Sequence, residues 1–139
     1  MLIDKVKKYI DNTYDLNCAE IILTAANEEY NLQLDKNALK LMAAFGGGLG
    51  VGRTCGVITA GAAVLSSLFV KDKGHESTLI KEIMKEFIEK FEEKLETDQC
   101  LVLKEKVKDD PMKCKGIILI GGEILQEVIE GRKEQTINS

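Results

Sequence analysis

A chain of 139 residues with 45% hydrophobic and 30% charged residues has the length and composition of one globular domain. The formal net charge of −4 excludes a broad nucleic-acid-binding surface, because phosphate contacts require concentrated basic side chains. One proline and only 5% aromatic residues favour helices over strands. We therefore expect an all-α fold with no nucleic-acid partner.

Three helices are predicted before the densest glycine run of the chain. They cover residues 1–12, 18–30 and 36–45. Hydrophobic residues repeat at helical spacing in the first, and Asn17 and Asp35 are suitable N-caps for the second and third. The run over residues 46–52 contains five glycines and should end the third helix.

The central helix is predicted from its cap and from its lack of charge. Thr54 can cap a helix that runs to about Val70. No residue between these two is charged, and the polar ones are Thr59, Ser66 and Ser67. A helix that is apolar on all sides belongs in the centre of a bundle. Alanine and glycine near its middle allow neighbouring helices to approach closely.

A long amphipathic helix follows, and Ser77 can cap it. Its apolar side chains recur every three or four residues, at Ile80, Ile83, Met84, Phe87, Ile88, Phe91 and Leu95. Lysine and glutamate fill the other positions, which is typical of a face exposed to solvent. The apolar stripe is also compatible with a homodimer.

Two more helices are predicted near the carboxyl end. Asp98 can cap a short helix over 99–107, and Asp110 followed by Pro111 predicts the start of a helix that runs to about Glu130. The sequence thus predicts a single bundle of five to seven helices around the central helix, within one domain over 1–139.

The secondary structure of two segments near the carboxyl end is less evident from the sequence. The apolar residues 116–122 are compatible with a short buried strand, but no second strand pattern exists to pair with them, so we predict helix. Residues 131–139 are polar, and we predict a frayed tail.

The chain has no feature of a signal peptide or membrane span. Its first five residues carry charges at close intervals, and the longest uncharged apolar run, 56–70, is shorter than the ~20 residues of a spanning helix. We therefore expect a cytoplasmic protein. In a reducing compartment, cysteines are more often redox groups or metal ligands than structural disulfides.

The four cysteines carry the most specific signal. They are Cys18, Cys55, Cys100 and Cys114, and no two form a Cys-x-x-Cys pair. Each falls in the first turn of a predicted helix, where unpaired backbone N–H groups and the helix dipole stabilise a thiolate. Thiolate is the form that attacks disulfides and binds metals. The alternative is that each is a small buried hydrophobic residue.

The cysteine pattern resembles a known family. An Asn-Cys-Ala-Glu segment at 17–20, a Phe-Gly-Gly-Gly run that leads to Thr-Cys-Gly at 54–56, and two later cysteines resemble the C_GCAxxG_C_C family of redox-active proteins. The resemblance covers 17–125 and implies that all four cysteines are redox-active. Within the motif, Val57 replaces the usual alanine and Ala60 replaces the usual glycine, which adds bulk to a close helix contact.

The glycine run is interpreted as bare backbone placed against the cysteines. Gly47, Gly48 and Gly56 would let N–H groups point at sulfur or a bound anion. Arg53 could lower the pKa of a thiol, although a surface charge on a loop explains it equally well. The run comes within one residue of a P-loop, but a helix rather than a strand precedes it. The single histidine, His75, lies in a charged turn without a catalytic partner.

Two mechanisms remain open from the sequence. In one, the four cysteines cycle between dithiol and disulfide and pass electrons to an unknown redox partner protein. In the other, they hold an iron–sulfur cluster or a zinc ion. A helical adaptor without enzymatic activity is the alternative from a different class.

Overall fold

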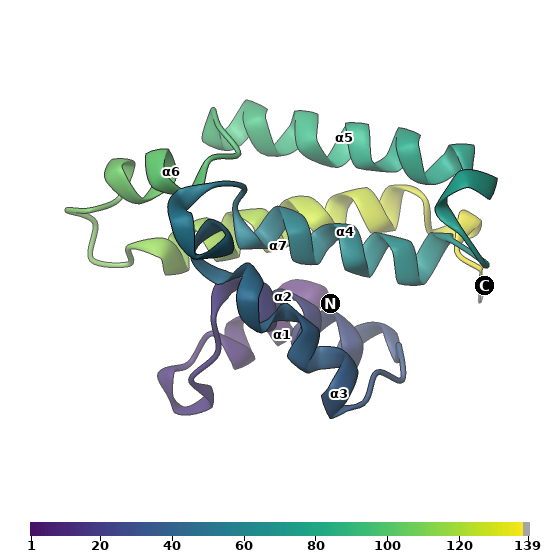
Figure 1. Cartoon of the computed structure of the whole chain (residues 1–139), viewed down its shortest axis with the longest axis horizontal. Helices are drawn as coiled ribbons and strands as arrows, with labels where there is room; N and C mark the ends of the chain where they lie inside the picture. Colours follow the sequence, from purple (N-terminus) through teal and green to yellow (C-terminus); the bar gives the residue numbers. More distant parts are fainter. Residues whose placement is uncertain (138–139) are drawn as a thin grey trace.

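The computed structural model describes residues 1–137 and contains seven α-helices joined by short helical turns (Figure 1). They are α1 (Leu2–Tyr9), α2 (Cys18–Tyr30), α3 (Lys36–Leu39), α4 (Gly56–Phe69), α5 (Thr78–Leu95), α6 (Cys100–Lys106) and α7 (Cys114–Gly131). Within this part of the chain the only β-structure is one isolated bridge between Thr54 and Gln99. The predicted all-α bundle is confirmed.

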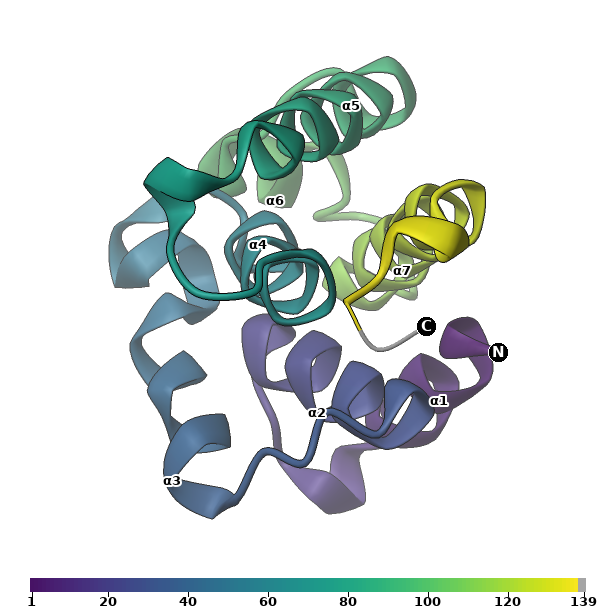
Figure 2. The same ribbon diagram turned by 90° about the vertical axis from the view of Figure 1, so that its right-hand side faces the viewer.

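The helices form three layers, which are clearest when the molecule is viewed from its end (Figure 2). Helices α4 and α7 make the middle layer, α5 packs on one side of both, and α1 and α2 pack on the other. The uncharged α4 contacts α2, α5 and α7, as expected for the central helix. Helix α7 shares that central position.

Glycines allow the central helices to approach their neighbours closely. A Cβ atom placed on Gly61 of α4 would lie 2.5 Å from Cε2 of Phe87 on α5. A Cβ atom on Gly121 of α7 would lie 2.5 Å from Cγ1 of Val57 on α4. The added bulk of Val57, noted in the sequence, is therefore accommodated by a glycine on the facing helix.

Three of the predicted N-caps are confirmed. The side chain of Asn17 accepts a hydrogen bond from the backbone of Glu20 at 2.8 Å, and Ser77 accepts one from Ile80 at 3.1 Å. Asp35 caps α3 in the same way. The predicted helix over 36–45 is α-helical only at its start, because residues 40–45 tighten into a 3₁₀ helix before the glycine run.

Two predicted caps, Thr54 and Asp98, are wrong for a shared reason. The backbone N–H of Cys55 donates to the carbonyl oxygen of Asp98 at 2.7 Å, and the N–H of Cys100 donates to Arg53 at 2.6 Å. These two bonds pair the segments as a short antiparallel bridge. Helices α4 and α6 therefore begin only after it, at Gly56 and Cys100.

The third incorrect cap is Asp110. Its side chain accepts a hydrogen bond from Met112 at 2.8 Å, and its carbonyl accepts one from Lys113 at 3.1 Å, so that residues 110–113 form a turn. Lys113 has a φ of 49°, which is incompatible with an α-helix. Helix α7 therefore begins at Cys114 instead of Pro111. The predicted helical state of residues 116–122 is confirmed.

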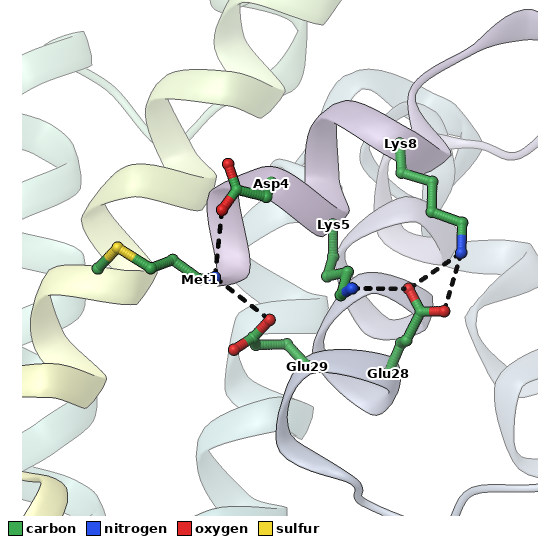
Figure 3. A network of polar contacts seen from close by, with 6 residues as sticks. All are labelled: Met1, Asp4, Lys5, Lys8, Glu28 and Glu29. Carbon is green, nitrogen blue, oxygen red and sulfur yellow. Dashed lines mark hydrogen bonds and ion pairs between the residues drawn. The ribbon is translucent and has the colours of Figure 1, made fainter.

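Ion pairs join α1 to α2 at the surface (Figure 3). Lys8 and Lys5 both contact the carboxylate of Glu28, at 2.9 Å and 3.8 Å. The amino terminus contacts Asp4 and Glu29 in the same region. These side chains are largely solvent-exposed, so each pair adds little to stability beyond fixing the orientation of α1 on α2.

No helix within residues 1–137 is both long enough and apolar enough to cross a membrane. After α7, residues 133–135 form a 3₁₀ turn, and the N–H of Ile137 donates to the carbonyl of Leu68 at 2.9 Å. The last two residues of the predicted tail over 131–139, residues 138–139, lie outside the described residues.

Candidate functional site

All four cysteines line a single cavity of about 540 Å³. Cys18, Cys100 and Cys114 are the first residues of α2, α6 and α7, and Cys55 immediately precedes α4. Helices α4, α6 and α7 begin at the same end of the molecule (Figure 1). The fold thus brings residues from four distant parts of the sequence to one space, and each lies at the start of a helix.

The four thiols are free and differ in exposure. Cys55 and Cys100 are buried, with 5% and 7% of their surfaces exposed. Cys18 and Cys114 are half-buried. The cavity lining also includes exposed residues, among them those of the turn before α7. The site therefore has two deep thiols and two that are easier to reach.

The capping box of α2 positions Cys18. Asn17 and Glu20 exchange side chain-to-backbone hydrogen bonds, and the Asn17 amide also donates to the carbonyl of Ala43 at 3.1 Å. The sulfur of Cys18 lies directly against Gly56, where a Cβ atom would overlap it. Gly56, the neighbour of Cys55 in the chain, must therefore be glycine because any side chain would overlap the Cys18 sulfur.

The bridge between Thr54 and Gln99 positions the two deep thiols, Cys55 and Cys100. Its two hydrogen bonds involve the backbones of Cys55 and Cys100, so these two residues are held at a fixed separation. Gly48 adopts a φ of 62°, and a Cβ atom there would lie 2.6 Å from Cβ of Cys100. The glycine run is thus packed against the cysteines, and Gly47 lines the cavity.

Burial dominates the ionisation of the two deep thiols. It raises the pKa of Cys55 to about 12, although N–H groups of Val57 and Ile58 at the start of α4 act in the opposite direction. Burial also raises the pKa of Cys100, and the charge of Lys104 partly offsets this effect. The expectation of a lowered pKa at helix starts is therefore wrong for these two thiols. Desolvation outweighs the helix N–H groups at Cys55 and the charge of Lys104 at Cys100.

The positive charges at the cavity are lysines. Arg53 is exposed and does not line the cavity, whereas Lys104, Lys113 and Lys115 do. The sequence analysis missed these lysines. The signal was present, since Lys104 follows Cys100 by four residues on one helix and the other two flank Cys114.

The rest of the lining is mostly apolar. It includes Ile10, Leu16, Ile21, Val57, Leu103, Ile117 and Ile118. No aspartate or glutamate lines the cavity, and His75 lies elsewhere in an exposed turn. The groups of the lining suited to disulfide exchange are therefore the thiols.

The positions of the four cysteines can be compared with the ligand sets that metals need. Iron–sulfur clusters and structural zinc ions need four ligands around one centre. In residues 1–137, no three side chains of His, Cys, Asp or Glu are grouped closely enough to hold one ion. The four cysteines share a cavity, but as arranged they do not form the ligand set of a single zinc ion.

Comparison with known proteins agrees with the cysteine pattern. Residues 16–128 match the family described as "Putative redox-active protein (C_GCAxxG_C_C)", and this match includes all four cysteines. No curated protein and no solved structure matches the chain. Because the matched region covers most of the sequence, the chain belongs to the C_GCAxxG_C_C family.

Proposed function

We propose that this protein is a thiol-based oxidoreductase of the cytoplasm that exchanges its own dithiol with the disulfide of a partner molecule. The observation that carries the proposal is that all four cysteines line one cavity. All four are free thiols in the structure, so the described state is the reduced one. The family to which the chain belongs supports redox chemistry in general.

The contacts favour two pairs, each with one deep and one more accessible thiol. Cys18 packs against Gly56, the neighbour of the buried Cys55. The buried Cys100 interacts electrostatically with Cys18 and, more weakly, with the half-buried Cys114. Because Cys18 is paired with Cys55, Cys114 is the accessible thiol left for Cys100. An accessible thiol suits attack on an incoming disulfide, and a buried one suits resolution of the mixed disulfide.

The proposed exchange balances without any further reactant. The thiolate of one cysteine attacks a sulfur of the partner disulfide, which breaks the S–S bond and releases the first partner thiol. The second cysteine of the pair then attacks the mixed disulfide, forms the protein disulfide and releases the second partner thiol. The protein loses two electrons and two protons, and the partner gains both.

The measurement that tests this proposal is a count of free thiols before and after mild oxidation, with metal analysis on the same anaerobic sample. We expect four thiols to fall to two and then to none as diamide is added, with no stoichiometric metal. Peptide mapping should then recover disulfides that join Cys18 to Cys55 and Cys100 to Cys114.

Single serine variants provide the matched control. Cys114→Ser should abolish one disulfide and leave the other, and Cys18→Ser should do the reverse. A count that stays at four throughout oxidation would contradict the proposal. A stoichiometric metal with a thiolate absorption band would replace it with the metal-bound alternative.

A further inference from the structure

We propose that the disulfide reduced in this cavity belongs to a small anionic molecule and not to a folded protein; this inference rests on the proposed function. It follows from three properties of the cavity: the depth of the thiols, the signs of the charges at its lining, and the apolar character of its walls.

The depth of the thiols favours a small molecule. The attacking cysteines, Cys18 and Cys114, are themselves half-buried, and they line the cavity beside the buried Cys55 and Cys100. Thiol–disulfide exchange requires the attacking sulfur to reach the partner sulfur directly. A disulfide on the surface of a folded protein cannot enter a space of about 540 Å³, whereas a molecule of several to a few tens of atoms can.

The charges at the lining favour an anion. Lys104, Lys113 and Lys115 line the cavity, and no acidic residue does, although the chain as a whole has a net charge of −4. Within the described residues, Lys104 and Lys113 make no ion pair. Lys115 has Asp11 as its acidic neighbour, outside the lining. Clefts lined by one sign of charge concentrate ligands of the opposite sign.

The walls define the rest of the ligand. Between the lysines and the thiols the lining is aliphatic, with Leu103 and Ile118 among its members. Such walls favour methylene groups of a ligand and disfavour a charged group that has no partner. A short aliphatic disulfide with carboxylates at its ends satisfies both parts of the lining, because its sulfurs then meet the cysteines while its carboxylates meet the lysines.

The experiment compares three small disulfides that differ mainly in charge. They are dithiodiglycolate, which is doubly negative, bis(2-hydroxyethyl) disulfide, which is neutral, and cystamine, which is doubly positive. Each reaction of the reduced full-length protein is followed by loss of free thiols, and each rate is divided by the rate of the same disulfide with dithiothreitol. This division removes differences in intrinsic reactivity.

We expect the normalised rate of the dianion to exceed that of the neutral disulfide about tenfold, with the dication slowest. Added salt should reduce this preference. The triple variant Lys104→Gln, Lys113→Gln, Lys115→Gln should lose most of it. A control with the same net charge, Lys36→Gln, Lys40→Gln, Lys71→Gln, changes lysines outside the cavity lining and should keep it.

The outcomes separate this inference from the proposed function. Equal normalised rates for the three disulfides, or equal effects of the two triple variants, would overturn the inference and leave dithiol chemistry standing. Oxidation by diamide but by none of the three disulfides would also overturn it. A protein whose thiols resist diamide as well would overturn the proposed function itself.

Discussion

Helices α4 and α7 are packed in opposite ways at two places along their length. Around Gly121 they approach so closely that a Cβ atom would lie 2.5 Å from Val57. At their starts, the same helices border the cavity of about 540 Å³, which Val57 and Ile118 also line. Val57 therefore belongs to both regions, with the tight contact forming the floor of the open space.

The comparison suggests how stability and chemistry are divided. The closely packed region contains fully buried side chains such as Phe87, Phe91 and Ile83, whose neighbours fill the space around them. The cavity end contains thiols and lysines in a space that other side chains leave empty. Close packing in one region can support a cavity in the other, because a densely packed interior has low compressibility and resists collapse.

The largest expected difference between the two regions is in the cost of removing an isoleucine. Ile83→Ala should lower the free energy of unfolding by about 3–4 kcal/mol, since Ile83 is fully buried in the closely packed region. Ile118→Ala should cost about 2 kcal/mol or less, because one side of Ile118 already faces the cavity. Urea unfolding of both variants at neutral pH measures this difference.

The same pair of variants tests the comparison in the opposite direction. Rates of thiol alkylation in the folded state should rise in Ile118→Ala, which enlarges the cavity, and stay near the wild-type values in Ile83→Ala. Equal losses of stability in the two variants would show that the cavity collapses around Ile118 in solution.

A smaller effect is expected from two glycines of α7. Gly121→Ala should lower stability by about 1–2 kcal/mol, because the new methyl group must displace Val57. Gly116→Ala should raise stability by about 0.5–1 kcal/mol, since its Cβ atom would meet only Met112 at 3.7 Å and alanine favours the helix. Unfolding midpoints of the two variants should therefore move in opposite directions. A stabilised Gly121→Ala would show that α4 and α7 are farther apart than described.

Much of the fold could be predicted because helical periodicity is local. The apolar stripe of α5 and the caps Asn17 and Ser77 depend on residues within one or two turns, and all three predictions are confirmed. The incorrect caps Thr54 and Asp98 fail because their backbones pair with each other across the chain. A contact between distant segments has no local signal in the sequence.

The candidate site shows the same division. The cysteines lie at helix starts as predicted, and this position follows from local patterns together with the family resemblance. The burial of these cysteines cannot be predicted from local patterns, because the depth of Cys55 depends on how α2, α4 and α6 pack together. The role expected for Arg53 rested on its closeness in sequence, whereas the charge that acts on Cys100 is that of Lys104.

The last expected effect concerns the pH dependence of stability near the buried thiol. The pKa of Cys55 is about 12 in the folded protein, whereas an unfolded cysteine ionises near 8.5. Below about pH 8 the thiol is protonated in both states and contributes nothing to pH dependence. As the pH rises above the unfolded value, only the unfolded state releases the proton, so the folded state is progressively destabilised.

Between about pH 8 and pH 9.5 this thiol should therefore cost wild-type protein about 1 kcal/mol of stability that Cys55→Ala does not lose. Urea unfolding of both proteins under reducing conditions measures the difference, and other groups that titrate in this range cancel because both proteins contain them. Ile83→Ala is the matched control, since it also shortens a buried side chain but lies outside the cavity lining and removes no ionisable group. It should keep the wild-type pH dependence. If Cys55→Ala kept it as well, the Cys55 thiol would ionise as readily in the folded protein as in the unfolded chain. Water would then reach the Cys55 thiol, and the cavity end would not keep this thiol buried beside the closely packed region.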